Sequence, residues 1–432
     1  MSFGEMSFLN KPEKKQEGTV NEKDKKIIFP HAESILRLFR NKYENEPEKA
    51  EIMEDIFYEF FEQEMKNTDI FESKKFDVAF PWTYIRTNDL LKKVIAKHSN
   101  KENLAKTLNS LTSDGVVRKQ EFIFSSGSMM KSGYQFTFVE EAMHQAVVAL
   151  KSGLISLQKG EAIKNREIYT LGLPTNELGK VSAVFLEKLK QDPFGSMSDI
   201  QAEFVESRIP KKGTKTQYSD VKFYGVSTGA SFAAAAGEKL IKNGVLTQSY
   251  EDAAQQTPHL SIRMDSPVGL SKSTRKNWQI PLGYVAEFVY QTFKDPKFRL
   301  ADPKFMNQVK QALNSRGIKE KMTDEDKKMK SEAIGLIIGK LKEGIDFSQD
   351  LKVTKVTGIM DPLTFSPEGY KTEKNRQAKL SGVLGKNISP RSEINRREFM
   401  INMTHTPDFF RDSEIRRCYA VASLVQKLQI SS

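Results

Sequence analysis

The spacing of apolar residues divides the chain into two parts of different character. Between about residues 27 and 110 apolar positions recur every three or four residues, for example around Ile56 and Leu90, and this spacing is typical of amphipathic helices. The sequence therefore predicts a mainly helical N-terminal extension over 29–160. The preceding residues 1–28 are rich in Lys, Glu, Asp and Asn, and we expect a disordered polar tail there.

Two β-rich segments interrupt this helical pattern. They cover 121–124 and 134–138 and flank the Gly/Ser segment SSGSMMKSG, as the strands of a β-hairpin do. Helices followed by such a hairpin resemble a winged helix-turn-helix, in which 103–114 would take the place of the recognition helix. The alternative is a helical layer with a hairpin packed against the main domain.

Beyond a long predicted helix from Glu140 to about Gln158, short β-branched runs alternate with helical segments. This alternation is typical of an α/β domain whose mostly parallel sheet is covered by helices on both faces, and we expect such a domain over 161–432. The expected strands cover 167–171, 221–225, 259–264, 353–360 and 399–403, and the expected helices include 181–190, 231–243 and 414–428.

Composition narrows the class of protein. The chain has 432 residues, of which 28 are Phe and 12 are Tyr; this supports a sizeable core and excludes a wholly disordered protein. No run approaches the roughly 20 apolar residues that cross a bilayer, and the first residues lack the apolar run of a secretory signal.

The single cysteine, Cys418, excludes an intrachain disulfide and a multi-cysteine metal site, so we expect a reducing, cytoplasmic location. The net charge of +11 favours an anionic partner only weakly, because the basic residues are scattered.

One segment carries a motif of nucleophilic catalysis. The residues Gly225-Val226-Ser227-Thr228-Gly229 match the pattern G-x-S-x-G, and they stand between a predicted strand and an alanine-rich predicted helix. The motif needs a strand-to-helix turn so sharp that the residues two before and two after the serine must lack bulk, and here both are Gly. The alternative is a Gly-rich structural turn. We predict that Ser227 is a nucleophile at this turn.

From about residue 165 onward, the order of these features resembles an α/β-hydrolase. A first strand and loop, the G-x-S-x-G turn, a strand ending at Asp265, a long insertion and two further strands follow one another as in that family. The resemblance implies that the nucleophile, the acid and the histidine come in this order along the chain. It makes His405, directly after the strand at 399–403, the general base. His259 stands at the start of its strand, at the opposite edge of the sheet from the catalytic loops.

The same resemblance implies the remaining site residues. Asp361 would be the triad acid, because it ends the penultimate strand and can reach a histidine on the loop of the next one. Asp265 is the alternative acid, since some members of the fold use that earlier strand. The implied oxyanion-hole donors are the backbone N–H groups of Thr228 and Leu173. The family usually has His-Gly in the first loop, where this chain has Leu171-Gly172.

Between Asp265 and residue 353 the pattern is largely helical, and the family commonly inserts a cap domain at this point. We therefore expect a helical cap over about 267–350 that covers the nucleophile and shapes a pocket for the acyl substrate. Three basic residues at its start could attract an anionic substrate, although a solvated basic face is the simpler explanation; they are Lys272, Arg275 and Lys276.

Other reaction classes find no support in the sequence. Neither a zinc-ligand spacing such as H-E-x-x-H nor a G-x-G-x-x-G after a strand is present, so the prediction includes no metal and no organic cofactor. The sequence predicts a serine hydrolase that cleaves an ester or a similar small acyl substrate through an acyl-enzyme. The rival hypothesis is an inactive α/β-hydrolase-like scaffold whose N-terminal region binds nucleic acid or another protein.

Overall fold

The structure is a computed structural model and describes residues 40–111, 118–124, 136–176, 178–209, 218–254, 257–265, 323–358 without 344, 346 and 349, 396–401 and 412–430. The strands are β1 (Asp69–Ser73), β2 (Val78–Arg86), β3 (Arg118–Phe124), β4 (Arg166–Leu171), β5 (Tyr218–Val226), β6 (His259–Asp265), β7 (Val353–Gly358) and β8 (Arg396–Ile401). The helices are α3 (Pro47–Lys66), α4 (Thr87–His98), α5 (Lys101–Leu111), α6 (Phe136–Gln158), α7 (Ala183–Gln191), α8 (Pro193–Arg208), α9 (Thr228–Lys242), α10 (Tyr250–Ala254), α13 (Asp324–Glu343) and α15 (Asp412–Ile430).

All the described strands belong to one sheet, in the order β1-β2-β4-β3-β5-β6-β7-β8. Strand β2 is antiparallel to both of its neighbours, and β3 to β8 are parallel to one another. This order, with the second strand reversed, is that of the α/β-hydrolase fold. The expected α/β class with a mostly parallel sheet is therefore confirmed, and the strand bounds predicted for β4 to β8 agree to within a few residues.

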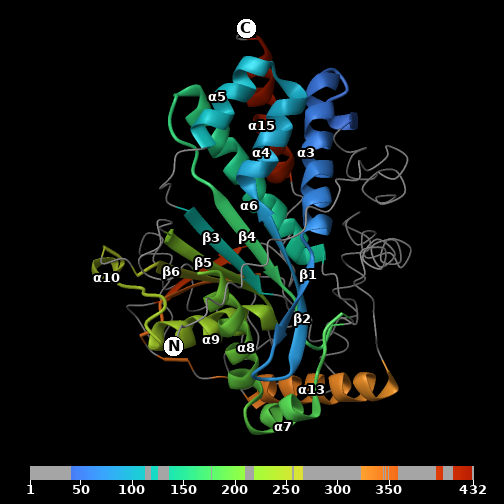
Figure 1. Ribbon diagram of the computed structural model, residues 1–432, viewed down its shortest axis with the longest axis vertical. Helices are drawn as coiled ribbons and strands as arrows, with labels where there is room; N and C mark the ends of the chain where they lie inside the picture. Colours follow the sequence, from blue (N-terminus) through green and yellow to red (C-terminus); the bar gives the residue numbers. More distant parts are fainter. Residues whose placement is uncertain are drawn as a thin grey trace, which may run out of the picture.

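The side chains of the strands alternate between two cores, one on each face of the sheet. On β3, for example, Ile123 belongs to one core while Phe122 and Phe124 belong to the other. The first core is completed by α3, α4, α6 and α15, and the second by α7, α8, α9 and α13. Figure 1 shows α3, α4, α5 and α15 gathered in its upper half and α7 and α13 at its lower end. The apolar alternation along each central strand thus accounts for helices on both faces.

The last described helix, α15, packs against α3 and against the residues directly before it. Tyr419 on α15 stacks on Tyr43, with ring centroids 4.5 Å apart, and its hydroxyl donates to Glu46 Oε1 at 2.9 Å. Lys49 on α3 donates to the same hydroxyl oxygen at 2.8 Å. Figure 1 shows α15 beside α3 and α4. The helical part expected over 29–160 therefore shares one core with the C-terminal helix.

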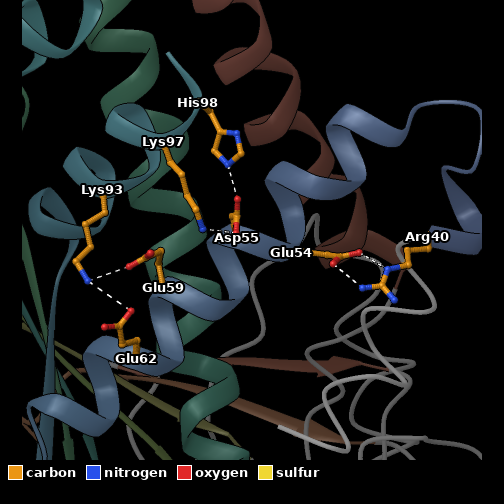
Figure 2. A network of polar contacts seen from close by, with 8 residues as sticks. All are labelled: Arg40, Glu54, Asp55, Glu59, Glu62, Lys93, Lys97 and His98. Atoms are coloured by element: carbon orange, nitrogen blue, oxygen red, sulfur yellow. Dashed lines mark hydrogen bonds and ion pairs between the residues drawn. The ribbon is translucent and has the colours of Figure 1, made fainter. Parts of the chain in front are cut away.

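Ion pairs join the polar sides of α3 and α4 (Figure 2). Asp55 on α3 accepts from Lys97 Nζ at 2.5 Å and contacts His98 Nε2 at 2.7 Å, and Lys93 lies 2.9 Å from Glu59. Burial alone would raise the pKa of Asp55, but the hydrogen bonds from His98 and Lys97 outweigh burial and leave that pKa below its ordinary value. Because most of these pairs are partly exposed, they orient the two helices more than they stabilise them.

The helical prediction for residues 27–110 is wrong over β1 and β2. Both strands lie inside that range and form one edge of the sheet. The segment 78–85, VAFPWTYI, is almost continuously apolar, and nearly all of it is buried. A run of this kind is typical of a strand covered on both faces, and it lacks the polar stripe that an amphipathic helix needs.

The predicted β-hairpin is also wrong. Strand β3 lies in the interior of the sheet, parallel to β4 and β5, and residues 136–138 begin the helix α6. The winged helix-turn-helix interpretation is therefore wrong as well, because it needs that hairpin as its wing, and the expected wing strand at 121–124 is β3, a central strand of the main sheet. The region before residue 160 therefore supplies β1, β2 and β3 to the α/β fold rather than forming only a helical extension to it.

The expected cap lies mostly outside the described residues, which resume at 323. From the cap range, α13 is described, and it packs against α7 and α8. Ala333 and Ile337 of α13 are fully buried in the second core, and Lys330 donates to the backbone oxygen of Asn176 at 2.8 Å. Asn176 follows the carboxyl end of β4, so α13 reaches the edge of the sheet at which β5 also ends. A cap over about 267–350 stays a prediction.

Candidate functional site

The candidate site is built on the turn between β5 and α9. Strand β5 ends at Val226, helix α9 starts at Thr228, and Ser227 alone connects them. Ser227 has φ 57° and ψ −125°, a combination that glycine adopts readily and serine rarely. Among the described residues, Asp77 is the only other non-glycine residue with positive φ. The strained strand-to-helix turn expected for a nucleophilic serine is confirmed.

The glycines of the motif let the turn close. A Cβ atom added at Gly225 would lie 2.3 Å from the backbone oxygen of Gly229, which is far inside contact distance. Further along α9 a residue without a side chain is needed again, because a Cβ at Gly237 would lie 2.7 Å from Ile262 Cδ1 on β6. Small residues therefore bring the start of α9 against the sheet, and the serine at the turn is 6% exposed.

We expect Gly225→Ala to disrupt this turn. The new methyl group would meet backbone atoms that cannot rotate away, so the free energy of unfolding should fall by about 2 kcal/mol or more. The measurement is a urea unfolding curve, read at constant slope. Gly335→Ala on α13 is the matched control, because a Cβ there meets nothing within 4 Å and alanine favours a helix interior. Equal midpoints for wild type and Gly225→Ala would contradict the close approach.

Thr228 is the first residue of α9 and is 4% exposed. Its backbone N–H therefore lies at the positive end of the helix dipole, directly after the serine. Backbone N–H groups at such a position can stabilise negative charge that develops on a carbonyl oxygen next to the nucleophile. The placement agrees with the oxyanion-hole role expected of Thr228.

Leu173, the other expected donor, is placed differently. It follows β4, and β3 separates β4 from β5: Leu171 pairs with Phe124, and Phe124 pairs with Gly225. At about 4.8 Å per strand, the end of β4 lies two strand spacings from the end of β5. Leu173 is also fully buried in the second core. Thr228 directly follows Ser227, whereas Leu173 follows a strand that is two positions away from β5 in the sheet; the oxyanion-hole role of Leu173 stays a prediction.

Asp265, the alternative acid, ends β6 next to the turn. Its backbone oxygen accepts the N–H of Ser227 at 3.0 Å. Its carboxylate accepts Arg263 Nε at 2.9 Å, Arg263 Nη2 at 2.8 Å and the hydroxyl of Tyr224 at 3.0 Å. The side chain of Asp265 is completely buried. Sequence reasoning missed these partners, although the alternation of Ser261, Arg263 and Asp265 on one face of a strand is a signal for them.

The expected base and acid, His405 and Asp361, both lie outside the described residues. The described histidines have contacts elsewhere: His98 pairs with Asp55, His144 lies 3.0 Å from a guanidinium nitrogen of Arg417, and His259 stacks on Tyr250. His259 also pairs with Asp220, near the amino end of β5, as its position at the start of a strand predicted. His405 and Asp361 stay predictions.

Comparison with known proteins gives structural likeness but no close relative. No protein-family model and no curated protein sequence matches the chain. A lipase candidate from Acinetobacter baumannii AYE is 12% identical with a TM-score of 0.37, over 93% of this chain and 97% of that one. An esterase from Thermogutta terrifontis is 10% identical with a TM-score of 0.34, over 84% and 99% of the two chains. An epoxide hydrolase from Bacillus megaterium is 13% identical with a TM-score of 0.33, over 81% and 98%. Because these TM-scores are low, the assignment of the fold rests on the strand order.

Two kinds of feature are absent from the described residues, a membrane-spanning helix and a metal-binding cluster. No helix in the described part of the chain has the length and apolar character needed to cross a membrane. Within the same residues, no group of three or more His, Cys, Asp or Glu side chains is arranged to hold a metal ion. Cys418, the single cysteine, is buried in the first core on α15.

Proposed function

We propose that the protein is a serine hydrolase that cleaves an ester or a similar acyl substrate, with Ser227 as its nucleophile. The observation that carries the proposal is the backbone of Ser227, which has φ 57° in a one-residue turn between a buried strand and a buried helix. Such strain costs on the order of 1–3 kcal/mol and persists where the surrounding structure enforces it. Here it presents a serine at the carboxyl edge of the sheet, next to the start of a helix.

The chemistry follows from these positions. Ser227 Oγ attacks the carbonyl carbon of the substrate while His405 takes the hydroxyl proton, and a tetrahedral oxyanion forms. The N–H of Thr228 at the start of α9 stabilises that oxyanion. His405 then returns the proton to the leaving group, an acyl-enzyme remains, and water hydrolyses it by the same steps. Asp361 holds the imidazole in the tautomer that can accept the proton.

The assignment of the acid is supported by the contacts of its competitor. The carboxylate oxygens of Asp265 already accept three hydrogen bonds, from Arg263 and Tyr224. A carboxylate has about four acceptor positions, so little capacity is left for an imidazole. This favours Asp361 over Asp265. For the second oxyanion donor, the position of Leu173 beyond β4 counts against the role expected of it.

The rival function is now less well supported. The scaffold hypothesis drew on the winged-helix pattern, and the structure places the supposed wing strand inside the sheet. Most of the expected cap, including its three basic residues, lies outside the described part of the chain, so a small acyl substrate that carries a negative charge stays a proposal.

The experiment that tests the proposal is labelling of the purified wild-type protein with a fluorescent fluorophosphonate. This probe reacts covalently with a serine that a base has activated, so we expect stoichiometric labelling of the native protein and none after heat denaturation. Turnover of short-chain p-nitrophenyl esters should accompany the labelling. A native, folded protein that neither reacts with the probe nor hydrolyses these esters would refute the proposed function.

A further inference from the structure

The strained turn at Ser227 needs partners that hold it, and the structure identifies one at the end of β6. Strands β5 and β6 pair in parallel up to Val226 and Asp265. The N–H of Ser227 then donates to the backbone oxygen of Asp265 at 3.0 Å, so the ladder of hydrogen bonds continues one residue into the turn. The position of the Asp265 carbonyl therefore helps to set the backbone of Ser227.

Side-chain contacts anchor Asp265 at this strand end. The planar guanidinium of Arg263 donates to both carboxylate oxygens of Asp265, from Nε to Oδ1 at 2.9 Å and from Nη2 to Oδ2 at 2.8 Å. The hydroxyl of Tyr224 also donates to Oδ2, at 3.0 Å. A bidentate pair of this kind fixes orientation as well as distance. Tyr224 is fully buried, the side chain of Asp265 is completely buried, and the side chain of Arg263 is 34% exposed, so the three side chains lie largely beneath the surface with Arg263 at the outer side.

The register of the strands explains why these groups meet. Tyr224 lies directly opposite Arg263, and Arg263 and Asp265 share one face of β6 because they are two residues apart. The other face of β6 carries the apolar residues that pack in the core of α9. The side chains of Tyr224, Arg263 and Asp265 therefore lie on the face of the sheet opposite α9, at the strand ends that precede the turn at Ser227.

We propose that Asp265 is a positioning residue for the nucleophile, and that Arg263 and Tyr224 hold it in place. We call these three residues the strand-end clamp. The inference rests on the proposed function of Ser227 and gives Asp265 a role other than that of triad acid. The clamp acts through the backbone: it fixes the Asp265 carbonyl, the carbonyl fixes the Ser227 N–H, and the turn then directs Oγ to the substrate.

The test compares two substitutions of Asp265. Asp265→Ala removes the two carboxylate oxygens that accept from Arg263 and Tyr224. We expect kcat for p-nitrophenyl acetate and the rate of fluorophosphonate labelling to fall about ten- to a hundredfold, while KM stays within about twofold of the wild-type value. Asp265→Asn keeps an acceptor for Tyr224 and should recover kcat to within about fivefold of wild type. The pH profile of kcat/KM should be unchanged in both variants, because the general base is another residue. Amide hydrogen exchange at Ser227 should become faster in Asp265→Ala.

Glu121→Gln is the matched control. Glu121 is a buried carboxylate on β3 of the same sheet, and it pairs with Lys222 at 2.7 Å, but it makes no described contact with the turn. Its replacement should lower the free energy of unfolding while leaving kcat and the exchange of the Ser227 amide unchanged. If Asp265→Ala does not fold, Tyr224→Phe, which removes only the hydroxyl donor, should lower kcat about two- to fivefold.

The outcomes separate the inference from the proposed function. Wild-type kcat and wild-type exchange at Ser227 in Asp265→Ala would overturn the clamp. A loss in Asp265→Asn as large as in His405→Ala, with an altered pH profile, would overturn it in favour of Asp265 as the triad acid. An unreactive wild-type protein in which Asp265→Ala alone speeds exchange at Ser227 would remove the proposed function and leave the clamp standing as a support of the turn.

Discussion

Replacement of Ser227 by alanine is expected to abolish fluorophosphonate labelling and to lower the turnover of p-nitrophenyl esters by about three orders of magnitude or more. The reason is that Oγ forms the covalent bond in the acyl-enzyme, and no neighbouring group can replace it. The measurement is steady-state ester hydrolysis beside gel detection of the probe. Ser231→Ala is the matched control: it removes another buried serine hydroxyl, in the first turn of α9 and four residues beyond Ser227, and both labelling and turnover should persist.

A second substitution at this position tests the turn itself, independently of catalysis. Ser227→Gly should be more stable than Ser227→Ala by about 1 kcal/mol, because glycine adopts positive φ without the steric cost that alanine has there. Urea unfolding of the two inactive variants measures the difference. Ester turnover that survives Ser227→Ala unchanged would place the chemistry elsewhere, whereas equal stability of the two variants would contradict the geometry of the turn.

His405→Ala is expected to damage turnover about as severely as Ser227→Ala, because a serine hydroxyl is a poor nucleophile when no base removes its proton. Asp361→Asn should lower turnover too, but by about one to two orders of magnitude less than His405→Ala does. The reason is that the acid orients and stabilises the imidazole without taking the proton. Turnover and the rate of probe labelling measure both effects. The circular dichroism spectra of the variants should match that of the wild type, because each substitution replaces a polar residue and not a large apolar one.

The matched control for His405 is His144→Gln on α6. His144 contacts Arg417 at the surface between α6 and α15, so its loss should leave turnover unchanged. Full activity in His405→Ala would remove this histidine from the mechanism. A loss confined to Asp265→Asn, with Asp361→Asn fully active, would reassign the acid and would at the same time refute the strand-end clamp.

Local patterns in the sequence were sufficient for much of the fold. Strands β4 to β8 and helices α7, α9 and α15 occur close to where alternation and helical spacing predicted them. The turn at Ser227 was equally local: the two glycines of G-x-S-x-G and the small residues after them determine whether a strand can pass directly into a packed helix. Each of these features depends on residues that are near one another in the chain.

Predictions failed where distant residues decide the conformation. The apolar run of β2 suits a buried strand or a buried helix, and only its pairing with β1 and β4 selects the strand. The residues from Phe136 on have β-forming side chains, yet they start α6, whose apolar residues pack on α4, α15 and the sheet. Tertiary packing overrides local preference in both cases.

The candidate site divides in the same way. The sequence by itself determined that Ser227 stands between a strand and a helix, with glycines that permit a turn at positive φ and with Thr228 at the start of the helix. Only the tertiary structure decided that β3 lies between β4, which precedes Leu173, and β5, which precedes Ser227. It also decided that Arg263 and Tyr224 donate hydrogen bonds to the carboxylate of Asp265. The physical reason is that strand order and register are set by the burial of whole faces of the sheet, so residues far apart in the chain become neighbours through packing that no local pattern encodes.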